Sequence, residues 1–177
     1  MRVFIAISIP YNHRSSLRRL QAGIKGARWV MCENFHVTLR FLGEVAPKEV
    51  EDLLFSLSAI ALPSFSINVS GVGYFSRKGK VRSVWASVCS SKQLLRLQKK
   101  VENICIRSGF CPGARKFKPH VTIGRLKGVR LHDIEYWLKI QNDFGIGSID
   151  VKKFTLFESR LGSEDPHYVP LEDYLLS

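Results

Sequence analysis

One short pattern occurs twice in this chain, and it limits what the chain can fold into. The segments FHVTLRFLGEV and KPHVTIGRLKGV each place a histidine two positions before a threonine, and the two histidines, His36 and His120, are 84 residues apart. The chain has only five histidines and three threonines, so chance would seldom produce two such pairs inside apolar runs. The repeat predicts a molecule built from two related lobes.

The spacing within each copy has a direct structural meaning. Successive side chains of a β-strand point to opposite faces, so residues two apart share a face. His36 and Thr38 therefore project together, as do His120 and Thr122. The valine between each pair projects to the other face, where it can anchor the strand in a core. If the lobes face each other, two imidazoles and two hydroxyls converge on one cleft.

The rest of the chain mixes strand-like and helix-like segments without regular βα alternation. Apolar spacing and turn signals predict strands at 1–9, 35–42, 65–75, 81–88, 117–126 and 148–161, and helices at 12–24, 47–61, 91–108 and 133–141. This order indicates an α+β protein with mainly antiparallel sheet. The length of 177 residues suits one domain, residues 1–177.

Composition narrows the partners and the location. The net charge of +12 favours a polyanion, with RNA or DNA first, an anionic membrane surface second, and a merely basic protein as the plain alternative. No apolar run approaches the roughly 20 residues of a membrane span. The start of the chain lacks the charge order of a secretory signal. The four cysteines form no CxxC pair and no zinc-ligand spacing. We therefore expect a cytoplasmic protein with free thiols.

Two imidazoles and two hydroxyls suit the hydrolysis of a cyclic phosphodiester. One proton must leave the attacking water, and one must reach the departing ribose oxygen. Imidazole titrates near pH 6.5, so a pair can serve as base and acid. The hydroxyls of Thr38 and Thr122 can donate hydrogen bonds to the non-bridging phosphate oxygens. The sequence has no carboxylate-rich cluster, so we expect neither a metal nor a cofactor.

Each histidine also has a plainer interpretation. A lone histidine in a strand is most often a hydrogen-bonded structural residue, and only the matched pair argues for catalysis by His36 and His120. His13, His132 and His167 lack the pattern, and we expect all three at the surface.

With these motifs, the chain resembles the two-histidine (2H) phosphoesterases. Within that superfamily it is similar to the RNA 2′,3′-cyclic phosphodiesterases, also called LigT-like proteins or 2′-5′ RNA ligases. The stretches that carry the resemblance are RVFIAISIP, FHVTLRFLGEV, KPHVTIGRL and FTLFESRLG. The resemblance implies a bilobal fold with two pseudo-symmetric lobes, outer helices and a central cleft.

The same resemblance implies an activity and its residues. It implies hydrolysis of RNA 2′,3′-cyclic phosphate ends to 2′-phosphate, with a possible weak and reversible 2′-5′ ligation. It makes His120 the group that activates water and His36 the group that protonates the leaving oxygen. The implied partner is RNA with a cyclic phosphate end, bound by a monomer without a membrane or a cofactor.

Phe41 and Arg125 lie five residues after the two histidines. In similar proteins the arginine after the second motif is taken to bind phosphate, which suits a guanidinium. Strict alternation would place both residues on the face opposite the histidines. Either a bulge re-aims them, or they are structural. Phe41 then stacks on a base or packs in the core.

RNA substrates also need stacking surfaces and backbone contacts. Candidates for stacking, each with core packing as the alternative, are Trp29, Tyr74, Phe75 and Trp85. Candidates for phosphate contacts, each with a solvated surface as the alternative, are Arg77, Lys78, Lys80, Arg82, Arg115, Lys116 and Lys118.

Two other functions remain open from the sequence. The first is a superfamily relative that acts on another cyclic or 2′-5′ phosphoester, because the same two motifs would serve. The second is a non-catalytic RNA-binding protein, whose binding would survive replacement of either histidine.

Overall fold

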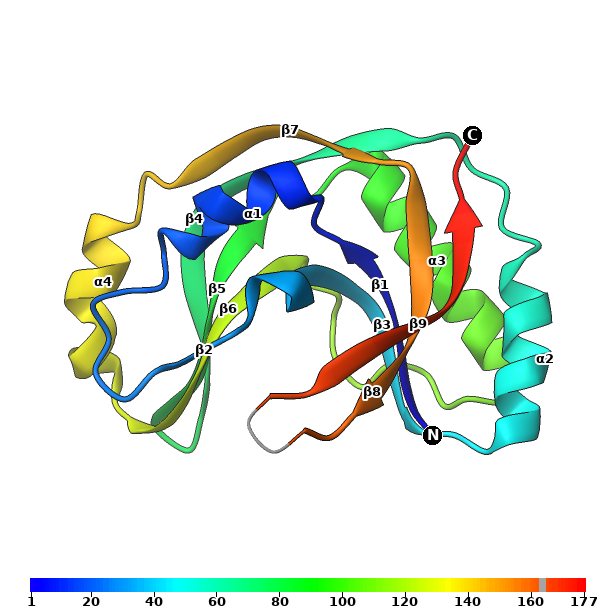
Figure 1. Ribbon diagram of the computed structural model, residues 1–177, viewed down its shortest axis with the longest axis horizontal. Coiled ribbons are helices and arrows are strands. Elements are labelled where there is room, and N and C mark those ends of the chain that lie inside the picture. Colours follow the sequence, from blue (N-terminus) through cyan, green and yellow to red (C-terminus); the bar gives the residue numbers. More distant parts are fainter. Residues whose placement is uncertain (163–164) are drawn as a thin grey trace.

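A computed structural model describes residues 1–162 and 165–177. A nine-stranded antiparallel sheet forms its centre, in the order β7-β4-β5-β6-β3-β1-β8-β9, with β2 paired to β6 (Figure 1). The strands are β1 (Arg2–Ser8), β2 (Arg28–Trp29), β3 (His36–Glu44), β4 (Phe65–Arg77), β5 (Lys80–Val88), β6 (His120–Val129), β7 (Gly145–Val151), β8 (Lys153–Arg160) and β9 (His167–Leu175).

In the described part of the chain, four α-helices and two short 3-10 helices connect the strands. They are α1 (Tyr11–Arg18), η1 (Cys32–Asn34), α2 (Pro47–Leu57), α3 (Lys92–Arg107), η2 (Leu131–Ile134) and α4 (Glu135–Ile140). The longest, α3, begins where the Ser91 hydroxyl accepts a hydrogen bond from the Leu94 amide. Its buried residues recur at helical spacing, at Leu94, Leu97, Val101 and Cys105. None of the described helices is long and apolar enough to cross a membrane.

The sheet consists of two halves that meet at a narrow seam. The first half contains β3, β1, β8 and β9, and the second contains β6, β5, β4 and β7. The halves join where β3 pairs with β6 through a single residue pair, Val37 opposite Val121. These are the two valines inside the repeated motif, so the seam places each copy of the motif against the other.

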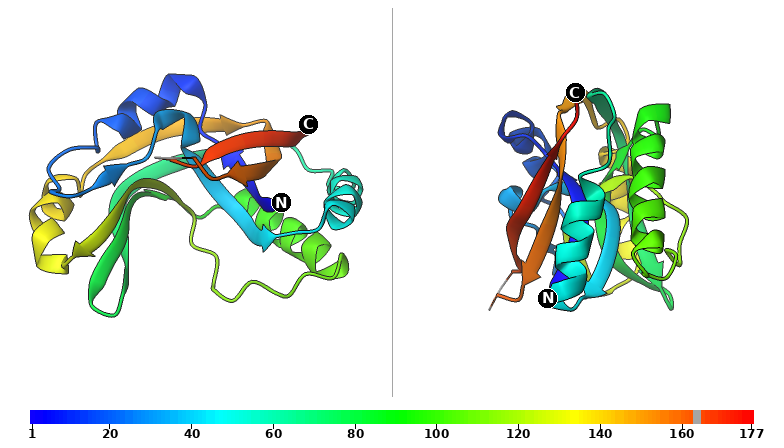
Figure 2. Two further views of the ribbon diagram at one scale, coloured as in Figure 1. Left: turned by 60° about the horizontal axis from the view of Figure 1, so that its bottom comes forward. Right: turned by 90° about the vertical axis from the view of Figure 1, so that its right-hand side faces the viewer.

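Each half has its own pair of helices. In Figure 1, α1 and α4 lie on one side of the molecule and α2 and α3 on the other, and the side views of Figure 2 agree. The Trp137 indole of α4 donates a hydrogen bond of 3.0 Å to the Leu20 carbonyl beyond α1. The Tyr174 hydroxyl of β9 donates one of 3.1 Å to the Leu54 carbonyl of α2. Val37 and Val121 are fully buried, and strand alternation places the histidines of both motifs on the opposite side of the sheet.

These observations confirm the expected α+β fold with antiparallel sheet, and they correct three details. The predicted strand 148–161 divides at Lys152, where the chain passes from β7 in the second half to β8 in the first. A continuous apolar run does not reveal such a crossing. Strand β9 was not predicted; it contains Pro170, which an edge strand tolerates. The predicted helix 12–24 ends at Arg18.

Candidate active site

The two motifs occupy equivalent places in the two halves. His36 is the first residue of β3 and pairs with Ser8 of β1, and His120 is the first residue of β6 and pairs with Ser87 of β5. Both histidines therefore lie at the same depth on either side of the seam. Because Val37 and Val121 are direct partners there, the histidines before them are brought to the same region.

Both imidazoles are oriented in the same way. Nδ1 of His36 donates a hydrogen bond of 2.6 Å to the Asn34 carbonyl, and Nδ1 of His120 donates one of 2.6 Å to the Lys118 carbonyl. A carbonyl only accepts, so each ring carries its proton on Nδ1 in the neutral form. Each Nε2 is then free to take up a proton, and after protonation it can donate one. This shared feature is what an acid–base pair requires.

Aromatic rings enclose His36. The centroids of the Phe4 and Tyr168 rings lie 5.0 Å and 5.3 Å from that of the imidazole. The Thr38 hydroxyl lies 3.0 Å from Nε2 of His36 and donates to it. The Thr38 hydroxyl thus has the imidazole of its own motif as its hydrogen-bond partner.

His120 has an aromatic wall of its own. The Phe75 ring meets it edge-on at 4.9 Å, and the buried Trp85 ring lies 5.6 Å away. The Lys118 ammonium lies 4.9 Å from the Trp85 ring centroid, a cation–π contact. Trp85 and Phe75, two of the stacking candidates, therefore line the surroundings of the second histidine.

Burial changes the proton affinity of both imidazoles. It is the largest of the causes that lower the pKa of His36 from 6.5 to about 4; the charges of Arg125 and His120 contribute less, and the hydrogen bond to Asn34 opposes the fall. Burial also lowers the pKa of His120, with a smaller contribution from Lys118. Both rings are therefore neutral at pH 7 before a phosphate binds.

A bulge in β3 brings Phe41 to the histidine side. Thr38 and Arg40 pair with adjacent residues of β1, so Leu39 is an extra residue in the strand. The extra residue reverses the alternation after Thr38. Phe41 consequently lies on the same face as the histidine, and Arg40 turns toward α3.

The same bulge occurs at the same place in β6. Thr122 and Gly124 pair with adjacent residues of β5, so Ile123 is the extra residue. Arg125 thereby returns to the histidine side, as Phe41 does in the first half. The alternative of a bulge, left open by the sequence, is the one that the structure has at both positions.

A pocket of about 430 Å³ collects residues from both halves. Four of the six predicted site residues line it: His36, Thr38, Phe41 and Arg125. His120 and Thr122 are not part of this lining, and they lie across the seam on β6. A larger cavity of about 780 Å³, at the start of α1 and the ends of β1, β7 and β8, contains none of the six.

Several residues of the pocket were not predicted as site residues. They are Arg2, Phe4, Ser159, Leu161, Pro166 and Tyr168. Strand alternation in 1–9 could have placed Phe4 on one face, but nothing in the sequence pairs that face with the histidine. Tyr168 lies on β9, a strand that was not predicted from the sequence.

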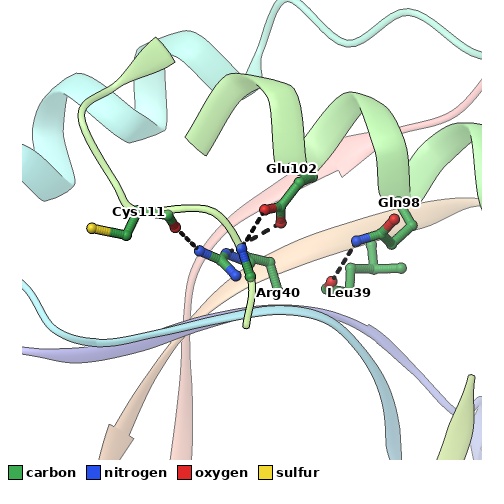
Figure 3. Close-up of polar contacts among 6 residues, drawn as sticks. Leu39, Arg40, Gln98, Glu102 and Cys111 are labelled. Atoms are coloured by element: carbon green, nitrogen blue, oxygen red, sulfur yellow. Dashed lines mark hydrogen bonds and ion pairs between the residues drawn. The ribbon is translucent and has the colours of Figure 1, made fainter. Parts of the chain in front are cut away.

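The arginine displaced by the bulge holds the segment that leads to His120. Arg40 forms an ion pair of 3.3 Å with Glu102 of α3 and donates a hydrogen bond to the Cys111 carbonyl. Glu102 also accepts a 2.7 Å hydrogen bond from the Gly113 amide (Figure 3). The first motif strand thus fixes the loop that ends at the second histidine.

The other predicted residues are more dispersed. Trp29 packs over Gly124, where an added Cβ would lie 2.8 Å from its ring, and Tyr74 is half-buried against the core. The basic residues 77, 78, 82, 115 and 116 are exposed, and Lys80 is partly so. His132 and His167 are exposed as expected, and His13 is half-buried. Across residues 1–162 and 165–177, no three His, Cys, Asp or Glu side chains are grouped to hold a metal ion.

An antiparallel sheet with one histidine–threonine strand on each side of a seam defines the class of two-histidine phosphoesterases. The family model described as LigT like Phosphoesterase matches residues 7–85 and, separately, residues 87–168, so each match contains one motif. The chain belongs to this family of LigT-like phosphoesterases.

Individual relatives agree with that assignment. The RNA 2′,3′-cyclic phosphodiesterase of Aeropyrum pernix is 37% identical over 141 residues, which cover 78% of this chain and 80% of the relative. The protein of the same name from Thermotoga maritima is 34% identical over 176 residues, with coverage of 95% and 91%. The crystal structure of Escherichia coli LigT complexed with 3′-AMP superposes with a TM-score of 0.81 at 26% identity, covering 99% of this chain and 98% of that one.

Proposed function

We propose that this protein hydrolyses the 2′,3′-cyclic phosphate at RNA ends to a 2′-phosphate. The observation that carries the proposal is the matched pair of imidazoles, each of which donates from Nδ1 to a backbone carbonyl and has its acceptor lone pair on Nε2. The names of the relatives from Aeropyrum pernix and Thermotoga maritima support the substrate.

The reaction needs a proton removed on one side of the phosphorus and one delivered on the other. In an in-line displacement, the water oxygen forms its bond to phosphorus as the bond from phosphorus to O3′ breaks. One imidazole accepts the proton of the water at Nε2, and the other donates a proton to O3′. Positions on opposite sides of the seam suit His36 and His120 to these two tasks.

The charge that develops on the non-bridging oxygens needs donors. Thr38 and Arg125 line the pocket with His36 and can supply a hydroxyl and a guanidinium. Thr122 shares the face of His120, and its hydroxyl can donate from the other half. We propose that Phe41 packs against the base or ribose, since 49% of its surface is exposed at the pocket.

The family resemblance and the burial of the two imidazoles point to different histidines as the base. The resemblance makes His120 the base and His36 the acid. The burial of His36 favours the reverse, because it lowers the pKa of this imidazole to about 4 and so keeps it unprotonated over a wide pH range. A bell-shaped pH profile would look the same for both assignments, since it reports only the two pKa values.

A cyclic phosphate substrate with sulfur in place of O3′ decides between the two assignments of base and acid. A thiolate leaves without protonation, so the variant that lacks the acid should regain most of its rate on this substrate, and the variant that lacks the base should not. Rescue of His36→Ala alone would establish the order implied by the resemblance. Rescue of His120→Ala alone would establish the reverse.

The proposed activity is tested on a short RNA with a 2′,3′-cyclic phosphate end, in excess chelator, with the position of the product phosphate determined. A 2′-phosphate, formed by the unaltered protein and lost in both histidine variants, is the expected result. A 3′-phosphate, or activity that requires an added metal, would contradict the proposal. RNA binding without turnover would establish the non-catalytic alternative.

Some expectations from the sequence stay proposals. We propose that residues 1–177 act as one domain and as a monomer, which the contiguous core across both halves supports. A cytoplasmic location is supported by the four cysteines, all of which are free thiols. Weak 2′-5′ ligation would follow if a ribose hydroxyl replaced water in the same site.

A further inference from the structure

The two halves of the sheet differ in charge. Strands β1, β3, β8 and β9 of the first half carry four basic and four acidic residues. Strands β4, β5, β6 and β7 of the second half carry five basic residues and one acidic residue, Asp150 of β7. The five, with Lys78 in the turn between β4 and β5, form what we call the basic hairpin surface: Arg77, Lys78, Lys80, Arg82, Arg125 and Lys127.

Within residues 1–162 and 165–177, the charges of the basic hairpin surface have no carboxylate partner. In the first half, Lys153 pairs with Asp173 at 2.6 Å and Arg160 with Glu158 at 2.8 Å. No ion pair among the described residues involves a member of the basic hairpin surface. A cluster of like charges without carboxylates favours an external polyanion.

This surface is continuous with the candidate active site. Arg125 lines the pocket of His36 and pairs across the ladder with Ser83, which pairs in turn with Phe75 beside His120. From Ser83, strand β5 runs three residues further to Lys80 at the hairpin turn. At about 3.3 Å per residue, the turn lies about 10 Å from the paired residues Arg125, Ser83 and Phe75. Figures 1 and 2 show the β4–β5 hairpin extending away from the body of the molecule.

We infer that the basic hairpin surface binds the RNA backbone on the 5′ side of the cyclic phosphate. The inference rests on the proposed function and extends it from the reacting end to the chain that carries this end. A single strand that enters at Arg125 and follows β5 meets several cations at the spacing of successive strand residues. Its phosphates make these contacts without reading sequence, and Phe75 offers a ring at the start of the path.

The surface makes the protein an enzyme for polynucleotide ends rather than for free cyclic nucleotides. A cyclic mononucleotide reaches the histidines, Thr38 and Arg125, but has no phosphates for the hairpin. We expect the KM for an octanucleotide with a cyclic phosphate end to be at least about tenfold lower than that for a cyclic mononucleotide at low salt. We expect this preference to decline as salt increases.

The test compares two variants that each lose four positive charges. The hairpin variant carries Arg77→Gln, Lys78→Asn, Lys80→Gln and Arg82→Gln. Asparagine is chosen because residue 78 has a φ of 52°, a left-handed conformation that asparagine tolerates. The control carries Lys92→Gln, Arg96→Gln, Lys99→Gln and Arg107→Gln on α3, which packs against the first half.

The readouts are KM and kcat for the octanucleotide and the mononucleotide over a series of salt concentrations. We expect the hairpin variant to raise the KM for the octanucleotide at least about tenfold and to flatten its salt dependence, with the mononucleotide unaffected. The α3 variant should change the octanucleotide KM by less than about threefold. Equal effects of the two variants, or a larger effect of the α3 variant, would overturn the inference.

The mononucleotide separates this inference from the proposed function. If the unaltered protein hydrolyses the mononucleotide and the octanucleotide with the same KM, the hairpin has no role although the proposed function stands. If it hydrolyses neither, the proposed function fails. Unfolding curves of both variants identify any loss of fold.

Discussion

The two halves of the sheet are alike in backbone and unlike in what they present. After each threonine the strand has one extra residue, and the third residue beyond the threonine returns to the histidine side. That residue is Phe41 in the first half and Arg125 in the second. In the function that we propose, the shared part supplies the proton-transfer groups, and the part that differs supplies recognition. The comparison then predicts that the repeated residues determine the chemistry, whereas the residues that differ between the copies determine the specificity.

The proposed equivalence of the two halves in proton transfer would fail if only one of the two histidines were required. We expect His36→Ala and His120→Ala each to lower kcat on a cyclic-ended RNA by at least about a hundredfold, because each removes one of two necessary proton transfers. His132→Ala, at an exposed histidine on η2, should leave kcat unchanged. Near-normal turnover in either motif variant would remove the paired mechanism.

The threonines sharpen the comparison. Thr38→Val and Thr122→Val should each lower kcat by about ten- to a thousandfold, because each removes a donor to the developing oxyanion. The Thr38 hydroxyl donates to Nε2 of His36, so we also expect its variant to shift the pH profile. Thr155→Val, on β8 outside the pocket of the histidines, is the matched control. If both motif variants were as active as the control, the hydroxyls would have no role in the reaction.

The residues after the bulges should differ in effect. Arg125→Met should raise the KM or lower kcat by about ten- to a hundredfold, since a charge-assisted hydrogen bond to phosphate is worth about 1.5–3 kcal/mol. Phe41→Leu keeps an apolar side chain and should change kcat/KM by less than about tenfold. Steady-state kinetics of the two variants measure the contrast, and a larger effect at Phe41 would reverse the proposed division of roles.

The pH dependence tests the burial of the two imidazoles. Both pKa values are lowered from 6.5, that of His36 to about 4, so kcat/KM should peak below pH 6.5 and decline on either side. The unfolded chain binds protons at these histidines below pH 6.5 and the folded one does not, so stability should decrease as the pH falls from 6.5 toward 4. The Tm of His36→Gln should be less sensitive over that range. A maximum of kcat/KM above pH 7 would contradict the lowered pKa values of the two imidazoles.

The smallest effect on activity is expected at Gly124, the counterpart of Arg40. An added Cβ would lie 2.8 Å from the Trp29 ring, so Gly124→Ala should destabilise the fold by about 1–3 kcal/mol and leave kcat nearly unchanged. Gly147→Ala is the control, because its Cβ would meet nothing within 4 Å. Thermal unfolding of both variants provides the measurement, and equal Tm values would show that Trp29 moves aside without cost.

Sequence reasoning could predict the parts that local periodicity determines. The shared face of His36 and Thr38 follows from alternation, and the antiparallel α+β fold follows from the order of segments. Family resemblance, in turn, gave the class of enzyme, which the family model and relatives confirm. The roles of the six predicted site residues stay predictions.

What the sequence left open depends on contacts between distant segments. The direction of Arg125 depends on an extra residue at Ile123, and only the register against β5 reveals it. The place of Tyr168 depends on β9 pairing with β8 at the sheet edge. The uneven distribution of charge is hidden because basic residues are frequent throughout the chain, and it emerges only when strands are sorted by half.

The single residue pair at the seam has a stereochemical consequence. A rotation that exchanges Val37 with Val121 also exchanges the histidines, and it would equally exchange the two oxygens of a cyclic phosphate ring. In a perfectly symmetric site, only the asymmetry of the ribose and its base would distinguish the 2′ from the 3′ oxygen. We propose that the groups that break the symmetry of the protein, Arg125 opposite Phe41 foremost, add to this discrimination, and the ratio of 2′- to 3′-phosphate formed by variants at these two positions would measure their contribution.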